Sequence, residues 1–399
     1  MRDTPEIRFK GFTGAWVQRK LGEVAELSSS KRIHVSDYVS EGIPFYRGSE
    51  ISAGGISQDN ELYISEDLYS EIKEKYGIPA KGDLLITAVG TLGNLWKVDN
   101  RRFYYKDGNL IRISGLKLDE DYILAYFTDG QGKKKVLDSA AGSSQKALTM
   151  IKLNEIDLFT PELSEQTAIG NFFRTLDKTI TLLKRKADGL KQLKKAYLQQ
   201  MFPQAGERVP KVRFAGVTGD WDKQKLENYF VERSERSGGG ELISVTINSG
   251  IVKASKLDRQ IISSEDKSNY KIVKVGDIAY NSMRMWQGAS GYSPYDGILS
   301  PAYTVITPNK STCSPFFAYL FKRLDMIQIF QKKSQGLTSD TWNLKFPAFS
   351  QIEVQAPFFN EQLIIADFLG KLDCKIASHL KKIEQLQRLK SAYLQKMFL

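Results

Sequence analysis

The sequence predicts two copies of a mixed α/β (α+β) domain in tandem, each followed by one long helix. Three observations lead to this fold class. An opening motif occurs twice, a long helical segment occurs twice, and segments with strand and helix patterns lie between them. At 399 residues the chain is also longer than one ordinary domain. We therefore expect a domain over residues 1–161, a helix over 162–203, a second domain over 204–357 and a second helix over 358–399.

The opening motif is the first repeat. Residues 5–16 return as residues 210–221, with Pro, Arg, Phe, Gly, Thr, Gly and Trp in register. Such a repeat indicates that one folding unit has been duplicated, and this determines the whole architecture. The stretches between the repeated ends have diverged. The sequence thus predicts a shared frame that holds two different inserts, which suggests two related tasks with different specificities.

The second repeat is helical. Residues 165–201 contain no proline, and their apolar residues recur every three or four positions, as they do again from residue 361 onward. Each helix should be about 37 residues and roughly 55 Å long. A helix of this length with one narrow apolar stripe needs a partner, and the other copy is the nearest candidate. We expect an antiparallel coiled coil with pseudo-twofold symmetry; packing on its own domain alone is the alternative. The expected seam consists of Leu176, Ile180, Leu183, Leu190, Tyr197, Leu372, Ile376, Ile383, Leu389 and Tyr393.

The inserts carry both strand and helix patterns. Residues 84–89 and 302–306 are apolar runs bounded by turn residues, which is typical of strands. Residues 121–128 and 315–330 have helical patterns. Each domain is therefore expected to be mixed α/β.

Composition limits the class of protein. The net charge of +11 and the pI of about 9.3 are consistent with a polyanionic partner. The polar start predicts no secretory signal, and the absence of a run of about 18 apolar residues predicts no membrane span. Only Cys313 and Cys374 are present, so we expect a reducing, cytoplasmic setting and no disulfide framework.

Residues with a catalytic pattern are missing. His34 and His379 lie far apart in the sequence, and no cluster has the spacing of metal ligands. Residues 130–133 do not match a phosphate-binding loop, so the lysines at 133–135 are expected to face phosphates or solvent. Asp67, Glu71 and Lys73 are expected on a surface helix. We therefore expect any catalysis to come from a partner.

Polar residues suited to DNA gather in loop-like segments of both inserts. Arg can bind guanine through two hydrogen bonds, Asn or Gln can bind adenine in the same way, and Lys or Ser can fix the register on phosphates. An ordinary surface role remains the alternative for each single residue. The candidates in the first insert are Lys31, Arg32, Tyr46, Arg47, Ser49, Thr91, Asn94, Lys97, Ser143, Ser144, Gln145 and Lys146. The candidates in the second insert are Arg233, Arg236, Asn281, Arg284, Gln287, Lys332, Lys333, Ser334 and Asp340.

The two repeats together resemble the specificity subunit of type I restriction–modification systems, called HsdS. The resemblance covers essentially the whole chain and rests on the Pro-x-x-Arg-Phe openings and on the helices that begin Glu-Gln and end Ala-Tyr-Leu-Gln-x-Met-Phe. It implies that each domain reads one half of a bipartite, asymmetric site in double-stranded DNA. It also implies that the coiled coil sets the gap between the halves.

The same resemblance implies partners and cofactors. Two methyltransferase subunits would dock on the frame and methylate adenine N6 with S-adenosylmethionine, and restriction/translocase subunits would cleave DNA with ATP and Mg²⁺. This chain would bind none of these cofactors and would not itself be an enzyme. In the family, the loops that resemble residues 90–94 and 142–146 lie at the DNA-facing surface, whereas residues 282–288 depart from that pattern. A protein-interaction scaffold and a standalone nuclease are the alternatives from other classes.

Overall fold

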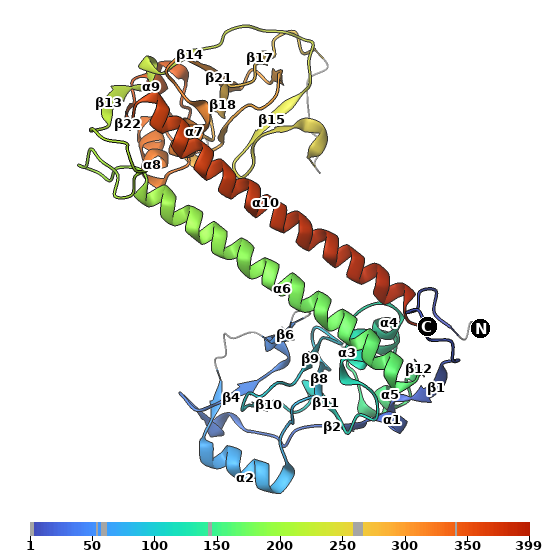
Figure 1. The fold of residues 1–399 in the computed structure, drawn as a ribbon. Helices are drawn as coiled ribbons and strands as arrows, with labels where there is room; N and C mark the ends of the chain where they lie inside the picture. The colour runs from blue at the N-terminus through green and yellow to red at the C-terminus, as the bar shows by residue number, and fades with distance from the viewer. Residues whose placement is uncertain (1–3, 53–54, 57–61, 143–145, 258–265, 340) are drawn as a thin grey trace. The chain divides into compact units, whose positions relative to one another are not determined.

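The computed structural model describes residues 4–52, 55–56, 62–142, 146–257, 266–339 and 341–399. The chain forms two compact units (Figure 1). The first unit comprises Met1–Arg185 and Leu380–Leu399, and the second comprises Lys186–His379. Each unit therefore contains one α/β domain together with part of each long helix.

The first unit is built on a four-stranded antiparallel sheet with the order β2-β11-β8-β9. The central strand β8 is buried along its length because its residues, Leu-Leu-Ile-Thr, are almost all apolar. A second sheet has the order β10-β4-β7-β3. The strands are β1 Val17–Lys20, β2 Glu26–Ser28, β3 Tyr38–Val39, β4 Ile43–Tyr46, β5 Ile51–Ser52, β6 Gly55–Ile56, β7 Tyr63–Ile64, β8 Leu84–Thr87, β9 Leu95–Lys97, β10 Tyr104–Tyr105, β11 Leu110–Ser114 and β12 Asp157–Thr160. The helices are α1 Leu21–Val24, α2 Glu66–Tyr76, α3 Glu120–Thr128, α4 Gly130–Asp138 and α5 Met150–Asn154.

The second unit repeats this topology. Its main sheet is antiparallel with the order β14-β21-β18-β19, so β18 takes the place of β8 and β19 the place of β9. The strands are β13 Asp222–Lys225, β14 Phe230–Glu232, β15 Ile243–Thr246, β16 Gly250–Lys253, β17 Lys271–Val273, β18 Ile278–Asn281, β19 Ser290–Tyr292, β20 Gly297–Leu299, β21 Tyr303–Pro308 and β22 Glu353–Ala356. The helices are α7 Ser314–Leu320, α8 Leu324–Lys333 and α9 Phe346–Ser350. The predicted fold class, a mixed α/β domain in two copies, is confirmed.

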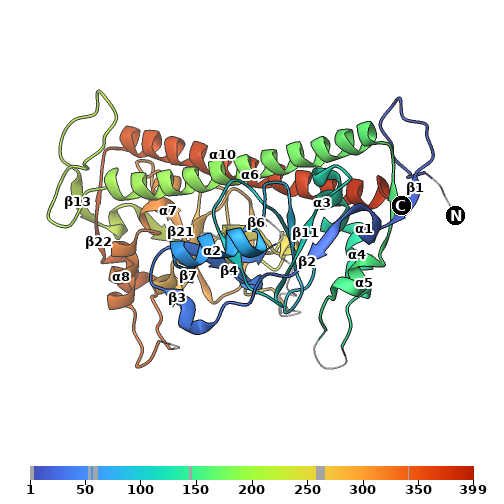
Figure 2. The same ribbon diagram turned by 90° about the horizontal axis from the view of Figure 1, so that it is seen from below.

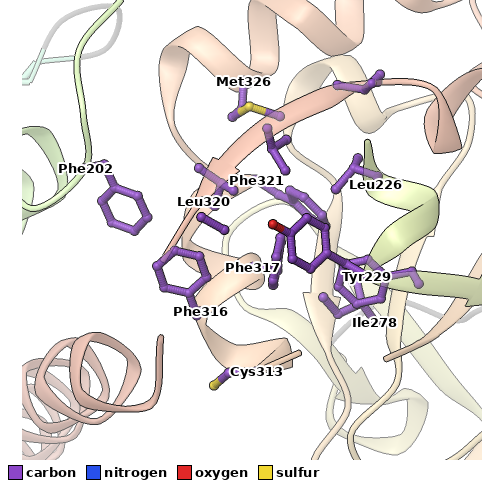
Figure 3. Close-up of a cluster of buried hydrophobic side chains, with 14 of the residues drawn as sticks. Phe202, Leu226, Tyr229, Ile278, Cys313, Phe316, Phe317, Leu320, Phe321 and Met326 are labelled. Carbon is purple, nitrogen blue, oxygen red and sulfur yellow. The ribbon is translucent and has the colours of Figure 1, made fainter. Parts of the chain in front are cut away.

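The core of each domain is aromatic and includes a phenylalanine that follows a long helix. In the second unit, Phe202 packs against Phe316, with ring centroids 5.3 Å apart (Figure 3). Phe202 also packs against Trp221, with ring centroids 5.8 Å apart. In the first unit, the ring of Phe398 occupies the matching position beside Trp16 and Tyr122. The end of each long helix is thus part of a domain core.

The long helices are α6, Leu163–Gln200, and α10, Phe359–Lys396, each of 38 residues. Figure 1 draws each of them as one unbroken helix, and Figure 2 shows the same two helices from below. In the first unit, Phe172 packs against Tyr393, and Asp177 pairs with Lys390. A residue further along α6 thus contacts a residue earlier in α10, which is the order found in antiparallel helices. In the second unit, Tyr197 packs against Phe368 in the same way. Each unit therefore contains an antiparallel pair of helical segments, as expected.

One residue of the expected seam is exposed. Ile180, Leu372, Ile376 and Ile383 are buried, and Leu176, Leu183, Leu190, Tyr197 and Tyr393 are half-buried. Leu389, however, is 43% exposed. On this part of α10 the buried residues 383 and 394 and the half-buried residues 386 and 390 form one stripe, and residue 389 lies about 100° around the helix from residue 390.

Two predicted segments have different bounds. The expected helix over residues 315–330 is divided into α7 and α8. Arg323 causes the division because its backbone is extended, with ψ of 147°, and its guanidinium donates to the carbonyls of Leu198 and Pro203. The strand expected over residues 84–89 ends at Thr87, before the turn at Gly90. The surface helix that carries Asp67 is confirmed as α2.

Candidate nucleic-acid interface

A surface concavity of the second domain contains three of the predicted DNA-contacting residues. It encloses about 740 Å³ and is bordered by the loop after β18 and by the turn between β15 and β16. Asn281 lies at the end of β18, and Arg284 and Gln287 follow it in the loop. The lining residues are Val245, Thr246, Ile247, Asn248, Ser249, Leu257, Asn281, Arg284, Gln287, Ala289 and Tyr303. The fold therefore brings an amide, a guanidinium and a second amide to one open site.

The loop that presents these groups is fixed by its own backbone. The amide of Arg284 donates to the Asn281 carbonyl at 2.9 Å, and the amide of Gln287 donates to the Arg284 carbonyl at 3.0 Å. Gly288 closes the turn with a φ of +79°, which favours glycine. The Trp286 indole donates to the Met283 carbonyl at 3.0 Å. The side chains of Arg284 and Gln287 thus project from an ordered loop.

Arg284 differs from the other arginine candidates of this domain in its partners. Within the described residues, no carboxylate forms an ion pair with it, and its side chain is exposed. Arg233, by contrast, makes two hydrogen bonds to the buried carboxylate of Asp277, at 2.7 Å and 3.1 Å, and one to Glu235. A DNA contact by Arg233 does not fit this arrangement, because the guanidinium is already used to satisfy a buried carboxylate. Its hydrogen bond to Asp277 raises the pKa of Arg233 further.

The remaining candidates of the second domain lie elsewhere. Arg236 is exposed and donates to the Asn269 carbonyl at 3.0 Å. Lys332 and Lys333 are exposed at the end of α8, and the Ser334 hydroxyl donates to the Phe330 carbonyl. None of these four residues lines the concavity. Asp340 lies outside the described residues.

In the first domain, the loop between β8 and β9 corresponds to the loop after β18. Gly90 and Gly93 have φ of +79° and +72°, and Thr91 between them is exposed. The side-chain amide of Asn94 donates to the Ile51 carbonyl at 3.2 Å, so it braces the loop. The ammonium of Lys97 pairs with the Asp121 carboxylate at 2.8 Å. Of these residues, Thr91 has the side chain most open to a ligand.

Four candidates near the start of the first domain are tied to other residues. The Tyr46 ring is only 5% exposed and packs against Trp96 and Phe103, so a DNA contact by this side chain does not fit the structure. The other three are polar. Arg47 and Ser49 both donate to the Glu50 carboxylate, and Arg32 pairs with the Asp107 carboxylate at 2.8 Å.

The basic candidates at the surface of the first domain are few. Lys31 is exposed, and its ammonium lies 5.4 Å from the centre of the Tyr76 ring. Lys146 is also exposed. Ser143, Ser144 and Gln145 lie outside the described residues.

The lysines at 133–135 do not form the phosphate-facing or solvated patch that the sequence predicts. They lie on α4, where the ammonium of Lys135 donates to the Asp157 carbonyl at 2.9 Å and to the Tyr126 hydroxyl at 3.1 Å. Lys133 donates to the carbonyls of Leu92 and Gly93. Only Lys134 is fully exposed. Burial lowers the pKa of both Lys133 and Lys135.

The repeated motifs themselves form a buried frame that sequence reasoning did not assign. Arg8 makes two hydrogen bonds of 2.6 Å to the Glu165 carboxylate, which is buried, and Arg213 binds Glu361 in the same way at 2.8 Å and 2.7 Å. These ion pairs connect the opening motif to the start of the long helix in each unit. Their signal in the sequence was the recurrence of Arg and Glu in register, but the pattern does not reveal that the two motifs meet.

The described residues hold no group of His, Cys, Asp and Glu that could bind a metal ion. In the described part of the chain, no helix combines the length and the apolar character needed to cross a membrane.

Two proteins that are similar to parts of this chain carry the names of specificity subunits. A type I restriction enzyme specificity subunit of Haemophilus influenzae is 33% identical over 172 residues, which are 43% of this chain and 42% of that protein. The MjaVIII specificity subunit of Methanocaldococcus jannaschii is 21% identical over 185 residues, which are 45% of this chain and 44% of that protein. The matched segments thus span less than half of each relative.

Solved structures share the fold over nearly the full length. The S subunit of a type I restriction–modification system from M. genitalium has a TM-score of 0.64 at 17% identity and covers 99% of both chains. A chain from work on complex assembly and conformational transition of the type I R-M system has a TM-score of 0.50 at 14% identity. It covers 97% of this chain and 98% of its own.

Residues 14–192 and 222–388 match the family described as Type I restriction modification DNA specificity domain. Each matched segment covers one α/β domain and part of the helix that follows it. The chain therefore belongs to the type I restriction–modification specificity family and carries two copies of its domain in tandem.

Proposed function

We propose that this chain supplies the DNA sequence specificity of a type I restriction–modification complex and leaves the chemistry to its partners. Each domain reads one half of a bipartite, asymmetric site in double-stranded DNA. The observation that carries this proposal is the concavity of the second domain, where Asn281, Arg284 and Gln287 come together in an ordered loop. Guanidinium and amide groups are the ones that bind guanine and adenine edges through paired hydrogen bonds.

In each domain, contacts to phosphates provide affinity and contacts to bases provide specificity. Exposed lysines such as Lys332 and Lys333 suit phosphates and give salt-dependent affinity. Arg284 and Gln287 suit base edges, and each good bidentate contact contributes about 1–3 kcal/mol of discrimination. The two domains differ at the corresponding loop, which holds Thr91 in the first and Arg284 in the second. Different loops on the same sheet would read different half-sites.

In this proposal the paired long helices set the length of the DNA spacer between the two half-sites. Two methyltransferase subunits dock on this frame, one for each unit, as in the family to which the chain belongs. Adenine-N6 methylation with S-adenosylmethionine, and cleavage with ATP and Mg²⁺ by restriction/translocase subunits, take place on these partners.

The test is to map methylated adenines by long-read sequencing in cells that express the chain with its methyltransferase subunit. A split motif should appear that is absent without the chain. Arg284→Ala should relax one half of this motif and leave the other half and the spacer unchanged. Arg208→Ala removes an exposed arginine of the same unit that does not line the concavity, so it should leave the motif unchanged.

Two outcomes would contradict the proposal. A complex that is shown to assemble but that leaves no chain-dependent methylated motif would argue against a reader of DNA sequence. A motif that Arg284→Ala leaves intact in both halves would remove the concavity of the second domain from the interface.

A further inference from the structure

A half-buried lysine in each domain holds the loop that follows the central strand. In the first domain, the ammonium of Lys133 donates to the carbonyl of Gly93 and, at 3.4 Å, to that of Leu92. In the second domain, the ammonium of Lys322 donates to the carbonyl of Gly288 and, at 2.7 Å, to that of Ile247. Gly93 and Gly288 both have a positive φ and both end a loop that leads into the hairpin partner of the central strand.

The two lysines lie at different places in the two copies of the domain. The backbone amides of Asp119 and Cys313 take equivalent places, since each donates to the glutamine that opens a long helix. Lys133 lies fourteen residues after Asp119, on α4, whereas Lys322 lies nine residues after Cys313, between α7 and α8. In both domains an ammonium thus donates to the carbonyl of the glycine that ends the loop, although the lysine lies on a helix in the first domain and between two helices in the second.

Placing these charges there costs free energy. Neither ammonium forms an ion pair with a carboxylate among the described residues, and both are partly withdrawn from water. Burial lowers the pKa of Lys133, and burial together with the nearby charge of Lys194 lowers the pKa of Lys322 to about 8. Charged groups with a perturbed pKa cluster at functional sites, and here each ammonium donates to two backbone carbonyls at the loop after the central strand or beside it.

The position of Lys322 connects both borders of the concavity. Ile247 belongs to the turn between β15 and β16, and Gly288 directly follows Gln287 in the loop after β18. One ammonium therefore fixes the distance between the two segments that line the site. In the first domain, Lys133 fixes only the loop that carries Thr91, and a side chain at Gly93 would come within 3.0 Å of this ammonium.

We propose that Lys133 and Lys322 are positioning residues for DNA recognition, each of which orients the reading loop of its own domain through the backbone. They do not themselves contact DNA. Lys322 sets the directions of Arg284 and Gln287, and Lys133 sets the direction of Thr91. The inference rests on the proposed function, because it assumes that these loops read DNA.

The experiment uses the full chain in complex with its methyltransferase subunit. Methylation is measured on DNA duplexes that carry the recognised motif, or a single base change in one half. Lys322→Met should reduce discrimination at the second half-site by about tenfold or more, the equivalent of one misplaced bidentate contact. Discrimination at the first half-site should stay unchanged. Lys133→Met should have the reverse effect.

Matched controls separate positioning from loss of fold. Lys134→Met changes the exposed neighbour of Lys133, and Lys310→Met changes an exposed lysine of the second domain, so neither should alter discrimination. Lys322→Arg keeps a charged donor and should restore discrimination at least in part, which a role in packing alone does not predict. The fluorescence of Trp286, which lies in the loop, should shift in Lys322→Met and not in Lys310→Met.

Each result has a definite reading. If wild-type chain directs a split motif but Lys322→Met and Lys133→Met discriminate as well as wild type in both halves, the positioning role is refuted and the proposed function stands. If the wild-type complex directs no motif, the proposed function itself fails. Should a methionine variant not assemble, Lys322→Leu or Lys133→Leu replaces it, and unchanged discrimination in that variant refutes the positioning role equally, since leucine has no side-chain donor.

Discussion

Phe398 follows the last turn of α10, yet its ring lies in the core of the first domain. The side chain is 5% exposed, and its ring centroid lies 5.4 Å from those of Tyr122 and Tyr126, 5.9 Å from Phe173 and 6.5 Å from Trp16. The substitution Phe398→Ala would remove most of these contacts and leave a cavity. The residues that lose contacts all belong to the first unit.

The expected cost follows from the size of the buried ring. A fully packed phenylalanine replaced by alanine lowers the free energy of unfolding by about 3–5 kcal/mol. For a unit of roughly 200 residues, this corresponds to a fall in Tm of about 6–20 °C. Phe202→Ala is the matched variant, because Phe202 occupies the corresponding place in the second unit.

The assay is hydrogen exchange of backbone amides, followed by mass spectrometry, with calorimetry for the Tm. In Phe398→Ala, peptides that contain β11 and α3 should lose protection, and peptides that contain β18 and α7 should keep it. Phe202→Ala should give the opposite pattern. The reasoning is refuted if Phe398→Ala leaves β11 and α3 as protected as in wild type, or if both variants affect the same domain.

Three further predictions concern charged groups. Arg8→Met should lower the free energy of unfolding, measured by chemical denaturation, by about 3–5 kcal/mol, because it leaves the buried Glu165 carboxylate unpaired. The double variant Arg8→Met, Glu165→Gln should recover part of this loss. No recovery would argue against the pairing. Burial raises the pKa of Glu50, but the hydrogen bonds from its neighbours lower it by more, so the net pKa is lowered. The stability that this group contributes is then complete above its unfolded pKa, about 4.3, and is lost as the pH falls below that value. Glu50→Gln should flatten this part of the pH–stability curve, and an unchanged curve would contradict the shift. Arg233→Ala should lower the Tm of the second unit because it breaks the ion pair with the buried Asp277. Arg284→Ala should leave that Tm unchanged and relax one half-site. Equal Tm values for the two variants would show that the ion pair of Arg233 does not stabilise the unit.

Much of the architecture follows from the sequence because its signals are local or periodic. The stripe of apolar residues at steps of three and four predicts α6 and α10, and the apolar run at Leu84 predicts the central strand β8. The in-register repeat predicts the duplicated sheet. The short polar segment that contains Asn281, Arg284 and Gln287 predicted a DNA-facing loop, and the fold does place these three residues around one concavity.

The tertiary structure alone decided which of the polar and aromatic residues are available. Arg233 and Arg284 are indistinguishable as residue types, but Asp277 lies 2.7 Å from the first and no described carboxylate pairs with the second. Tyr46 belongs to the core because Trp96 and Phe103 fold against it. Partners of this kind come from distant parts of the chain, and neither propensity nor periodicity specifies them.

The contacts that join the long helices to the domains were likewise decided by the tertiary structure. The sequence by itself determined that the chain is a duplicated domain with two long helices, since repetition and helical periodicity are properties of neighbouring residues. It did not determine that Phe398 completes the first domain, that Arg8 neutralises Glu165, or that Lys133 and Lys322 reach equivalent glycines from different positions. Those contacts join residues far apart in sequence, and only the packing of the whole unit brings the two sides of each contact together.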